Sequence, residues 1–354
     1  MFKLSKELYD NISKHKNCFE QFEDIESVLV YGDINEEMPY ISYVIPTFCR
    51  PDLLVKTIKS ILKQKEVYSY EIIIVDNSED FTNNNPNKSA IERIDDKHVR
   101  LYVNEKNLGQ AGNWNRGIEL ARGKYVSLIH DDDLLNSNYS TEIFKCIHNA
   151  EKSSSKVGII KVKFLEFNDE NNIPVFKSKN RGGIIRHTSI DSMINGFGLT
   201  NCPTCGIILN PEAVIEAGGF NMDYYPSFDY ILGQQICECG YSTFVTEYVL
   251  GLYRIGVNDT LKRENLIGFC EADYLYREYL YSRTKFGSLF GNMFRRVQYR
   301  ESKKSLQTLA KRFGQDISLE EFNLIDIKDP SHLATLLFKI VRKLIRVKNN
   351  KVIY

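Results

Sequence analysis

The 354-residue chain lacks the long apolar runs that mark membrane-spanning or secreted proteins. No stretch approaches the roughly 18 consecutive apolar residues of a membrane span. Residues 1–37 are charged throughout and do not resemble a signal peptide. We therefore expect a cytoplasmic protein, in which the eight cysteines are thiols and not disulfides.

The chain also lacks an excess of charge of either sign, because 46 basic residues balance 46 acidic ones. Nucleic-acid-binding proteins more often carry a basic excess, so nucleic acid is not an expected partner. Two cysteine pairs, Cys202 with Cys205 and Cys237 with Cys239, raise the question of zinc. A single residue separates the second pair, which is poor spacing for zinc, and both pairs lie in apolar surroundings. Buried thiols are the favoured interpretation.

Four apolar segments rich in β-branched residues predict buried strands, and their starts lie 25 to 30 residues apart. They span 41–46, 71–76, 99–103 and 124–129. Helical patterns lie between or after them, beginning at Pro51 and covering 109–122 and 139–151. Apolar strands that alternate with helices predict an α/β fold with a mainly parallel central sheet flanked by helices. The run 83–87 is interpreted as a polar loop.

Beyond residue 157 the order is less regular. We expect strands at 157–167, 205–209 and 242–253, helices at 211–217 and 229–239, and a helical stretch over 262–328. The tail from Ser331 has no acidic residue and six Lys or Arg residues. Its apolar side chains share one helical face and its basic ones another: Leu333, Leu336, Leu337, Ile340 and Leu344 against Lys339, Arg342, Lys343 and Arg346. Two interpretations stay open, contact of 331–351 with an anionic membrane surface and docking of the apolar face on the main domain.

Polar residues follow three of the expected strands at the edge where ligands bind in open α/β sheets. They are Pro46-Thr47, Asp76-Asn77 and the run His130 to Asp133. Three adjacent carboxylates repel one another, and a divalent cation with oxygen ligands would offset that repulsion. The alternative is a solvated turn whose aspartates cap the following helix.

Five blocks in this order resemble the family 2 glycosyltransferases of the GT-A fold, which invert the anomeric centre and of which many build bacterial surface polysaccharides. The blocks are Tyr43–Arg50, Ile73–Ser78, Asn107–Gly109, Asn115–Ile118 and Gly123–Asp133. Gly218–Phe220, followed nine residues on by Asp229, also fits. The resemblance covers about 40–255 and implies domains at 39–260 (a nucleotide-binding half 39–135 and an acceptor half 136–260), with a helical extension at 1–38 and a helical region at 261–354.

The resemblance also implies roles in donor binding. Pro46, Thr47 and Arg50 would lie along the nucleotide, and Asp76 would accept a hydrogen bond from the N–H of a pyrimidine ring. Further donor contacts are expected from Asn77, Asn107 and either Asn113 or Asn115, with the holding of loops as the alternative for these asparagines. Arg254 would lie near the diphosphate. Trp114 is interpreted as a core residue.

The family's Asp-x-Asp motif falls on His130-Asp131-Asp132, so His130 replaces its first aspartate. Asp132 would hold Mn²⁺ or Mg²⁺, Asp131 would reach the ribose or the water shell of the metal, and Asp133 would cap a helix. The role of His130 stays open between a donor-sugar contact and metal ligation. Asp229 would be the general base, with Asp223 as a fallback. Phe228 stands where the family usually has glutamate, and a histidine often found after Arg254 is absent.

The implied function is transfer of a hexose from a nucleotide-sugar, expected to be a UDP-sugar, to a hydroxyl of a glycan or lipid-linked glycan acceptor. The protein would be cytoplasmic or peripheral on the inner face of the plasma membrane. Two alternatives stay open. One is a sugar nucleotidyltransferase, against which the absence of glycine from the loop after the first strand counts. The other is a non-catalytic sugar-nucleotide-binding relative.

Overall fold

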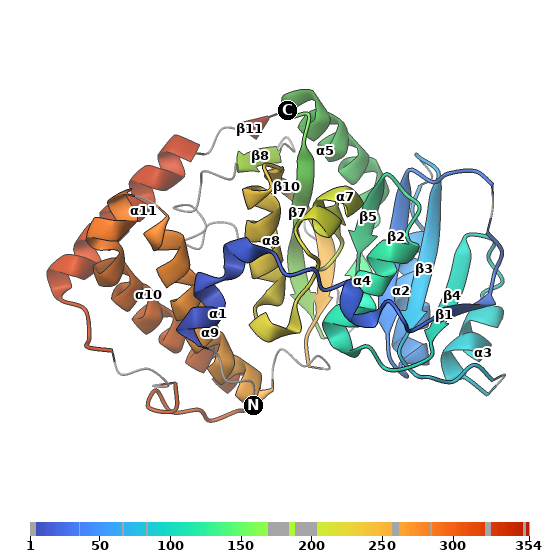
Figure 1. Cartoon of the computed structure of the whole chain (residues 1–354), viewed down its shortest axis with the longest axis horizontal. Helices are drawn as coiled ribbons and strands as arrows, with labels where there is room; N and C mark the ends of the chain where they lie inside the picture. The colour runs from blue at the N-terminus through green and yellow to red at the C-terminus, as the bar shows by residue number, and fades with distance from the viewer. Residues whose placement is uncertain are drawn as a thin grey trace.

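The computed structural model describes residues 5–34, 36–65, 67–82, 84–168, 184–187, 204–256, 262–283, 285–322, 327–349 and 352–353. Over these residues a single mixed sheet runs through the molecule, and helices cover it (Figure 1). The strand order is β1-β4-β3-β2-β5-β9-β7-β10-β8-β11, with β6 paired to β10. The α/β class expected from the sequence is confirmed.

The parallel part of the sheet is made by the four strands that the apolar runs predict. They are β2 (Ile41–Thr47), β3 (Tyr70–Asp76), β4 (Val99–Asn104) and β5 (Tyr125–Leu128). Helices α2 (Pro51–Leu62), α3 (Pro86–Glu92) and α4 (Gly109–Leu120) connect them. β2, β3 and β4 are buried along almost their whole length, because helices lie on both faces of the sheet.

The other half of the sheet is mixed, with one long parallel pair and several short antiparallel strands. β7 (Val157–Phe167) and β10 (Ser242–Arg254) pair in parallel, whereas β9 (Ile207–Leu209) runs antiparallel to both β5 and β7. The short strands β6 (Leu134–Leu135), β8 (Ile184–His187) and β11 (Val352–Ile353) pair antiparallel with their neighbours.

Two apolar cores lie on the two faces of the sheet. One contains side chains of α4, α7 (Pro211–Glu216), α8 (Phe228–Glu238) and α9 (Arg263–Ser282). The other contains those of α2, α3 and α5 (Tyr139–Ser153). Alternation along β2 serves both, since Val44 faces the first core while Tyr43 and Ile45 face the second.

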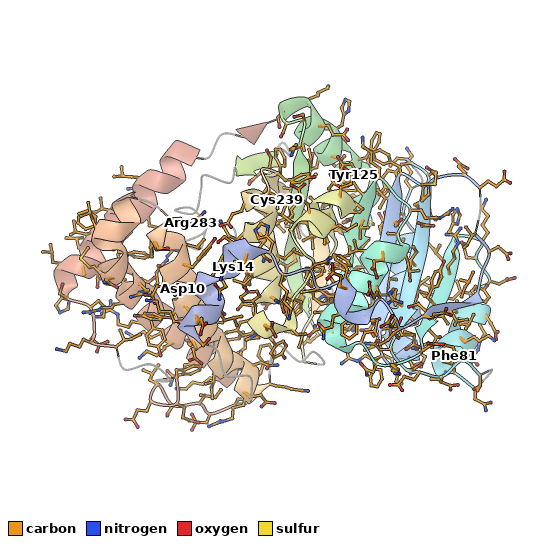
Figure 2. All side chains as sticks on the ribbon, in the orientation of Figure 1. Asp10, Lys14, Phe81, Tyr125, Cys239 and Arg283 are labelled. Carbon is orange, nitrogen blue, oxygen red and sulfur yellow. The ribbon has the colours of Figure 1, made fainter. Side chains whose placement is uncertain are left out.

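The N-terminal segment is helical only in part, which corrects the expected helical extension. It holds the short helix α1 (Lys6–Asp10), the 3-10 turns η1 (Ile12–Lys14) and η2 (Glu20–Phe22), and strand β1 (Ser27–Tyr31). β1 adds an antiparallel edge to β4. Figure 2 shows the side chains of this segment, with Asp10 and Lys14 labelled, beside those of α8 and α9. The segment thus belongs to the body of the protein.

The C-terminal region is helical, as expected, with α9 followed by α10 (Lys285–Arg312) and α11 (His332–Asn349). α11 packs on α10 at the end of the molecule away from β1–β4 (Figure 1). Within the described ranges, no helix is both long and apolar enough to cross a membrane.

Candidate active site

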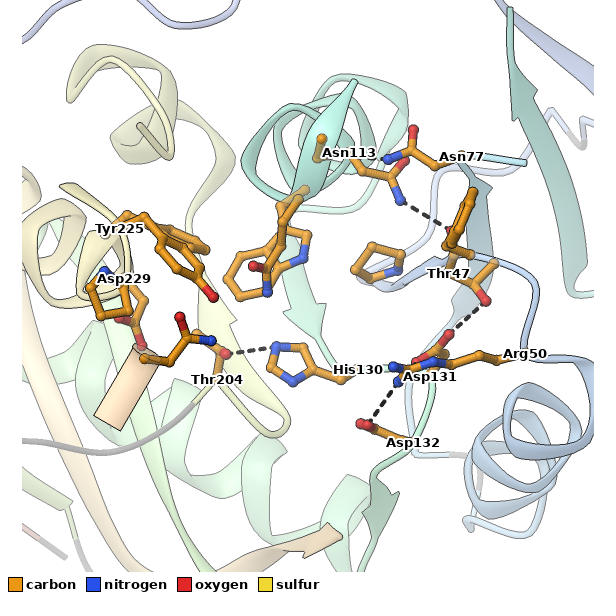
Figure 3. A pocket seen from close by; sticks show the side chains of 18 of the residues that line it. Thr47, Arg50, Asn77, Asn113, His130, Asp131, Asp132, Thr204, Tyr225 and Asp229 are labelled. Atoms are coloured by element: carbon orange, nitrogen blue, oxygen red, sulfur yellow. Dashed lines mark hydrogen bonds and ion pairs between the residues drawn. The ribbon is translucent and has the colours of Figure 1, made fainter. Parts of the chain in front are cut away.

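A cavity of about 390 Å³ opens at the carboxyl edge of the parallel strands. Thr47 ends β2 and Asn77 follows β3, and the turn that begins at His130 comes two residues after β5. These strands run in the same direction, so their carboxyl ends meet at one edge. Figure 3 shows side chains from all three strand ends around the cavity, with Tyr225 and Asp229 on its other side.

Most of the expected site residues line this cavity. They are Pro46, Thr47, Arg50, Asn77, Asn107, His130, Asp131, Asp132 and Asp229, together with Asn113 and Trp114. Trp114, expected only in the core, both lines the cavity and is 5% exposed. Asp76, Asn115 and Arg254 are not among the lining residues.

Asp131 and Asp132 lie at the centre of a short polar network. The hydroxyl of Thr47 donates to Oδ2 of Asp131 at 2.7 Å. Nη1 of Arg50 lies 3.1 Å from Oδ2 of Asp132 and 3.6 Å from Oδ1 of Asp131. Both aspartates are buried, and burial raises the pKa of Asp131 to about 6. The sequence predicts that the ends of β2 and β5 lie close together, and the structure shows direct side-chain contacts between them.

Asp133 does not cap a helix, which corrects one expectation. Strand β6 follows it, and α5 begins only at Tyr139. Asp133 is fully buried, and its Oδ1 accepts the backbone N–H of Arg254 at 2.9 Å. Burial, followed by the nearby charge of Asp132, holds its pKa well above the usual range. An ionised carboxylate in this place is shielded from water and lies near a second negative charge. Both effects cost free energy unless a cation offsets them.

Arg254 and Thr57 hold the backbone of the aspartate run. Nε of Arg254 donates to the carbonyl of Asp132 at 2.7 Å, and its guanidinium lies 4.5 Å from the centre of the Phe167 ring. The Thr57 hydroxyl lies 2.9 Å from the carbonyl of Asp131 and 2.7 Å from that of Asp133. Arg254 was expected beside the diphosphate. In the structure its side chain donates to the backbone of the aspartate run and is not among the residues that line the cavity.

His130, Asp132 and Asp133 form the one cluster within the described ranges whose ligand atoms are placed to share a metal ion, all within 4.8 Å of one another. Nε2 of His130 pairs with the Thr204 hydroxyl at 2.8 Å, while Nδ1 lies 3.7 Å from Oδ2 of Asp133. That Oδ2 is buried and has no hydrogen-bond donor among the described N–H and O–H groups. Burial lowers the pKa of His130, which favours the neutral imidazole that a metal requires. The donor set fits a divalent cation such as Mn²⁺ or Mg²⁺.

Asp229 stands on the wall opposite the aspartate run, in the first turn of α8 (Figure 3). Burial raises its pKa to about 6, and the ammonium of Lys161 opposes the rise. Asp223, the fallback base, has a side chain that is 51% exposed and paired with Lys16, and it does not line the cavity. Geometry thus favours Asp229 over Asp223.

Asp76 and Asn115 hold loops. Asp76 is fully buried, and its Oδ2 accepts from Ser78, Asn85 and Asn87 at 2.9 to 3.1 Å. Asn115 exchanges two hydrogen bonds with the backbone of Phe220. The pyrimidine contact of Asp76 and the donor contact of Asn115 stay predictions.

Several lining residues have no motif that could have identified them, among them Thr204, Tyr225, Asn265 and Phe269. The last two come from α9, so the C-terminal helical region contributes to the site. Cys202 of the possible zinc pair lies outside the described residues. Cys205 and Cys237 are buried free thiols, and the described ranges hold no zinc-type cysteine cluster.

Acidic side chains at the carboxyl edge of the sheet face Asp229 across one cavity, and comparison with known proteins bears on the class of protein that has this site. Residues 42–210 match the model of glycosyl transferase family 2. This region, which holds the strand ends and the aspartate run, belongs to that family, and the expected family is confirmed.

The relatives are similar over part of their length. A GalNAc(5)-diNAcBac-PP-undecaprenol beta-1,3-glucosyltransferase of Campylobacter jejuni is 39% identical over 109 residues, 29% of this chain and 33% of that protein. A putative colanic acid biosynthesis glycosyl transferase of Escherichia coli is 34% identical over 95 residues, 27% and 33% of the two chains. The chain thus spans about a third of the length of these relatives. A mannosyltransferase of Pyrobaculum calidifontis, solved with GDP-Man and Mn²⁺, aligns over 96% of this chain and 87% of its own at 14% identity and a TM-score of 0.49.

Proposed function

We propose that the protein is an inverting glycosyltransferase that moves a hexose from a nucleotide-sugar, a UDP-sugar in our proposal, to a hydroxyl group of a growing surface glycan. The observation that carries the proposal is the position of Asp229, which lies across one cavity from the cluster of His130, Asp132 and Asp133. Inverting transfer needs a base on one side of the sugar and charge stabilisation on the other.

His130, Asp132 and Asp133 would hold the cation. Bound there, Mn²⁺ or Mg²⁺ would supply positive charge to the leaving diphosphate. Arg50 lies beside Asp131 and Asp132, with its side chain 36% exposed, and is placed to contact a phosphate oxygen. Thr47 fixes Asp131, which is available for the ribose.

Asp229 would act on the acceptor. Its carboxylate takes the proton of the acceptor hydroxyl while that oxygen bonds to the anomeric carbon, and the bond from this carbon to the diphosphate oxygen breaks. A base with a pKa of about 6 is mostly ionised at neutral pH yet still basic enough to accept a proton.

The proposed acceptor is a glycan, in the further proposal a lipid-linked one. The similarity to the C. jejuni glucosyltransferase, whose name gives an undecaprenol-linked glycan as its acceptor, supports this and covers 33% of that protein. Thermal-shift measurements with UDP-, GDP- and dTDP-sugars, with and without Mn²⁺, would identify the donor: the expected result is stabilisation by a UDP-sugar that requires the cation.

Two variants test the roles of the opposing groups. Asp132→Ala should abolish Mn²⁺-dependent transfer and the Mn²⁺-dependent thermal shift, while Asp229→Asn should keep the shift and lose transfer. Asp223→Asn is the matched control, because this carboxylate is exposed and outside the cavity. Metal-independent turnover by Asp132→Ala at the wild-type rate would refute the proposal.

A further inference from the structure

Helix α11 has a row of apolar side chains that no other part of the described structure covers. Its leucine face is exposed to solvent over three turns, with exposed fractions from 36% to 65%, and consists of Leu333, Leu336, Leu337, Ile340 and Leu344. The spacing of three, four, seven and eleven residues places them along one stripe of the helix. Single exposed leucines are ordinary, but a stripe of five marks an interaction surface.

A different face of α11 attaches the helix to the protein. Ala334 and Phe338 are buried, and Phe338 packs edge-on against Phe294 of α10 with ring centres 5.6 Å apart. Thr335 accepts a hydrogen bond from Arg300, and Arg342 pairs with Glu301 at 3.6 Å. The leucine face is therefore not the docking face. Docking uses Ala334 and Phe338 and leaves the five residues of the leucine face outside, so the expected docking of that face is not what the structure shows.

The charged residues of α11 are all basic. Lys339 and Lys343 are exposed, and Lys343 follows Leu336 by about two helical turns, which places it at the border of the face. No acidic residue occurs from Ser331 to the last residue, against six Lys or Arg, in a chain whose formal net charge is zero. The segment that carries the leucine face is therefore positively charged.

We propose that the leucine face of α11 inserts into the surface of an anionic membrane, with Lys339 and Lys343 at the level of the lipid phosphates. The helix would lie in the plane of the interface, since an 18-residue helix with cations along its length does not span a bilayer. The inference rests on α11 alone and holds whatever reaction the cavity performs.

A second copy of the chain is the other occupant to consider. Two leucine faces brought together would place Lys339 and Lys343 of each copy near those of the other, with no acidic side chain on the segment to neutralise them. Anionic lipid headgroups supply that neutralisation. Charge complementarity therefore favours the membrane.

Vesicle flotation of the full chain tests the proposal. We expect the protein to float with vesicles of phosphatidylcholine and phosphatidylglycerol, to bind vesicles of phosphatidylcholine alone at least about tenfold more weakly, and to lose binding as salt is raised. The double variant Leu336→Asp with Ile340→Asp should lower binding at least about tenfold. Lys339→Gln with Lys343→Gln should lower binding to the anionic vesicles by about fivefold for each charge removed.

The control is Ile215→Asp on α7, which removes an apolar side chain of similar exposure, 53%, far from the tail in the sequence. Circular dichroism melts verify that each variant is folded. Absence of vesicle binding, equal binding to neutral vesicles, or an equal loss in Ile215→Asp would each overturn the proposal. So would a dimer, seen by sedimentation, that the Leu336 and Ile340 substitutions dissociate while vesicle binding is unchanged.

Discussion

Lys161 is predicted to set the pH range in which Asp229 is ionised. It stands on β7, 9% exposed, and its Nζ lies 3.7 Å from the point where a Cβ on Gly233 would be. Gly233 is one helical turn after Asp229 on α8, so the ammonium lies next to the turn that carries the carboxylate. The pKa of Asp229 is raised by burial to about 6, and Lys161 is the charge that opposes this rise.

Several other charged groups on the elements that contact α8 have partners of their own. Lys163, on the same face of β7 as Lys161, pairs with Glu247 of β10, and Asp223 of η4 (Met222–Tyr224) pairs with Lys16. Glu238, at the far end of α8, accepts hydrogen bonds from Tyr279 and Gln234 and lies 3.7 Å from the imidazole of His15. Among the described residues, Lys161 is the charged side chain that acts on the pKa of Asp229, so its removal should raise that pKa.

Lys161→Met should move the acid limb of the pH profile of kcat/KM upward. An ammonium within about 4–6 Å typically shifts a carboxyl pKa by about one to three units, so the limb should move from about 6 to about 7 or higher. Because only the ionised carboxylate is a base, activity at pH 7 should fall by about twofold for a shift of about one unit and by about tenfold for about two.

The assay is transfer measured from pH 5 to 9 with saturating cation, beside Lys161→Arg and Lys163→Met. The arginine variant keeps the positive charge and should keep the wild-type limb, and Lys163→Met should leave it in place. An unchanged limb in Lys161→Met would refute the link between the two residues. A fall in kcat at all pH values would indicate lost packing in place of lost charge.

Three further substitutions test the scaffold of the site. Glu71→Gln should lower the free energy of unfolding by about 3–5 kcal/mol in a denaturant titration, because the buried carboxylate pairs with Arg100 and Arg122 and leaves both without a counter-charge when removed. Thr57→Val should lower kcat by about tenfold and the free energy of unfolding by about 1–3 kcal/mol, since the buried carbonyls of Asp131 and Asp133 would lose the hydroxyl that donates to them. Gly117→Ala should cost about 1–3 kcal/mol in the same titration, because its Cβ would lie 2.3 Å from a side-chain carbon of β2; a stable alanine variant would show that the strand can move.

The edge that holds the site could be predicted because it depends on chain direction alone. β2, β3 and β5 are apolar runs that the sequence displays, and parallel strands must end on the same side. Two missed elements also had signals. Asn85, taken as part of a polar loop, accepts from the backbone of Asn87 and Lys88 and so begins α3, with Pro86 in its first turn. The β-branched run Ser27–Tyr31 forms β1.

Partners from distant segments could not be predicted. The carboxylate of Asp76 accepts hydrogen bonds from Asn85 and Asn87 because the loop after β3 folds back over it. Arg254 holds the carbonyl of Asp132, 122 positions earlier in the chain, and no periodicity in the sequence relates the two. Side-chain direction at such places is decided by the packing of the whole domain, which local patterns do not encode.

Two of the departures from the family pattern, His130 and Phe228, are far apart in the sequence and both contact Trp114 in the structure. The ring of Trp114 lies 4.9 Å from that of His130 and 5.0 Å from that of Phe228. Phe228 is 4% exposed, so a glutamate in its place would bring a carboxylate against the indole. An unpaired buried charge costs several kcal/mol or takes up a proton. Restoring the glutamate alone would therefore destabilise the wall that positions His130, and the aromatic wall and the histidine are best understood as one change in the chemistry of the cavity.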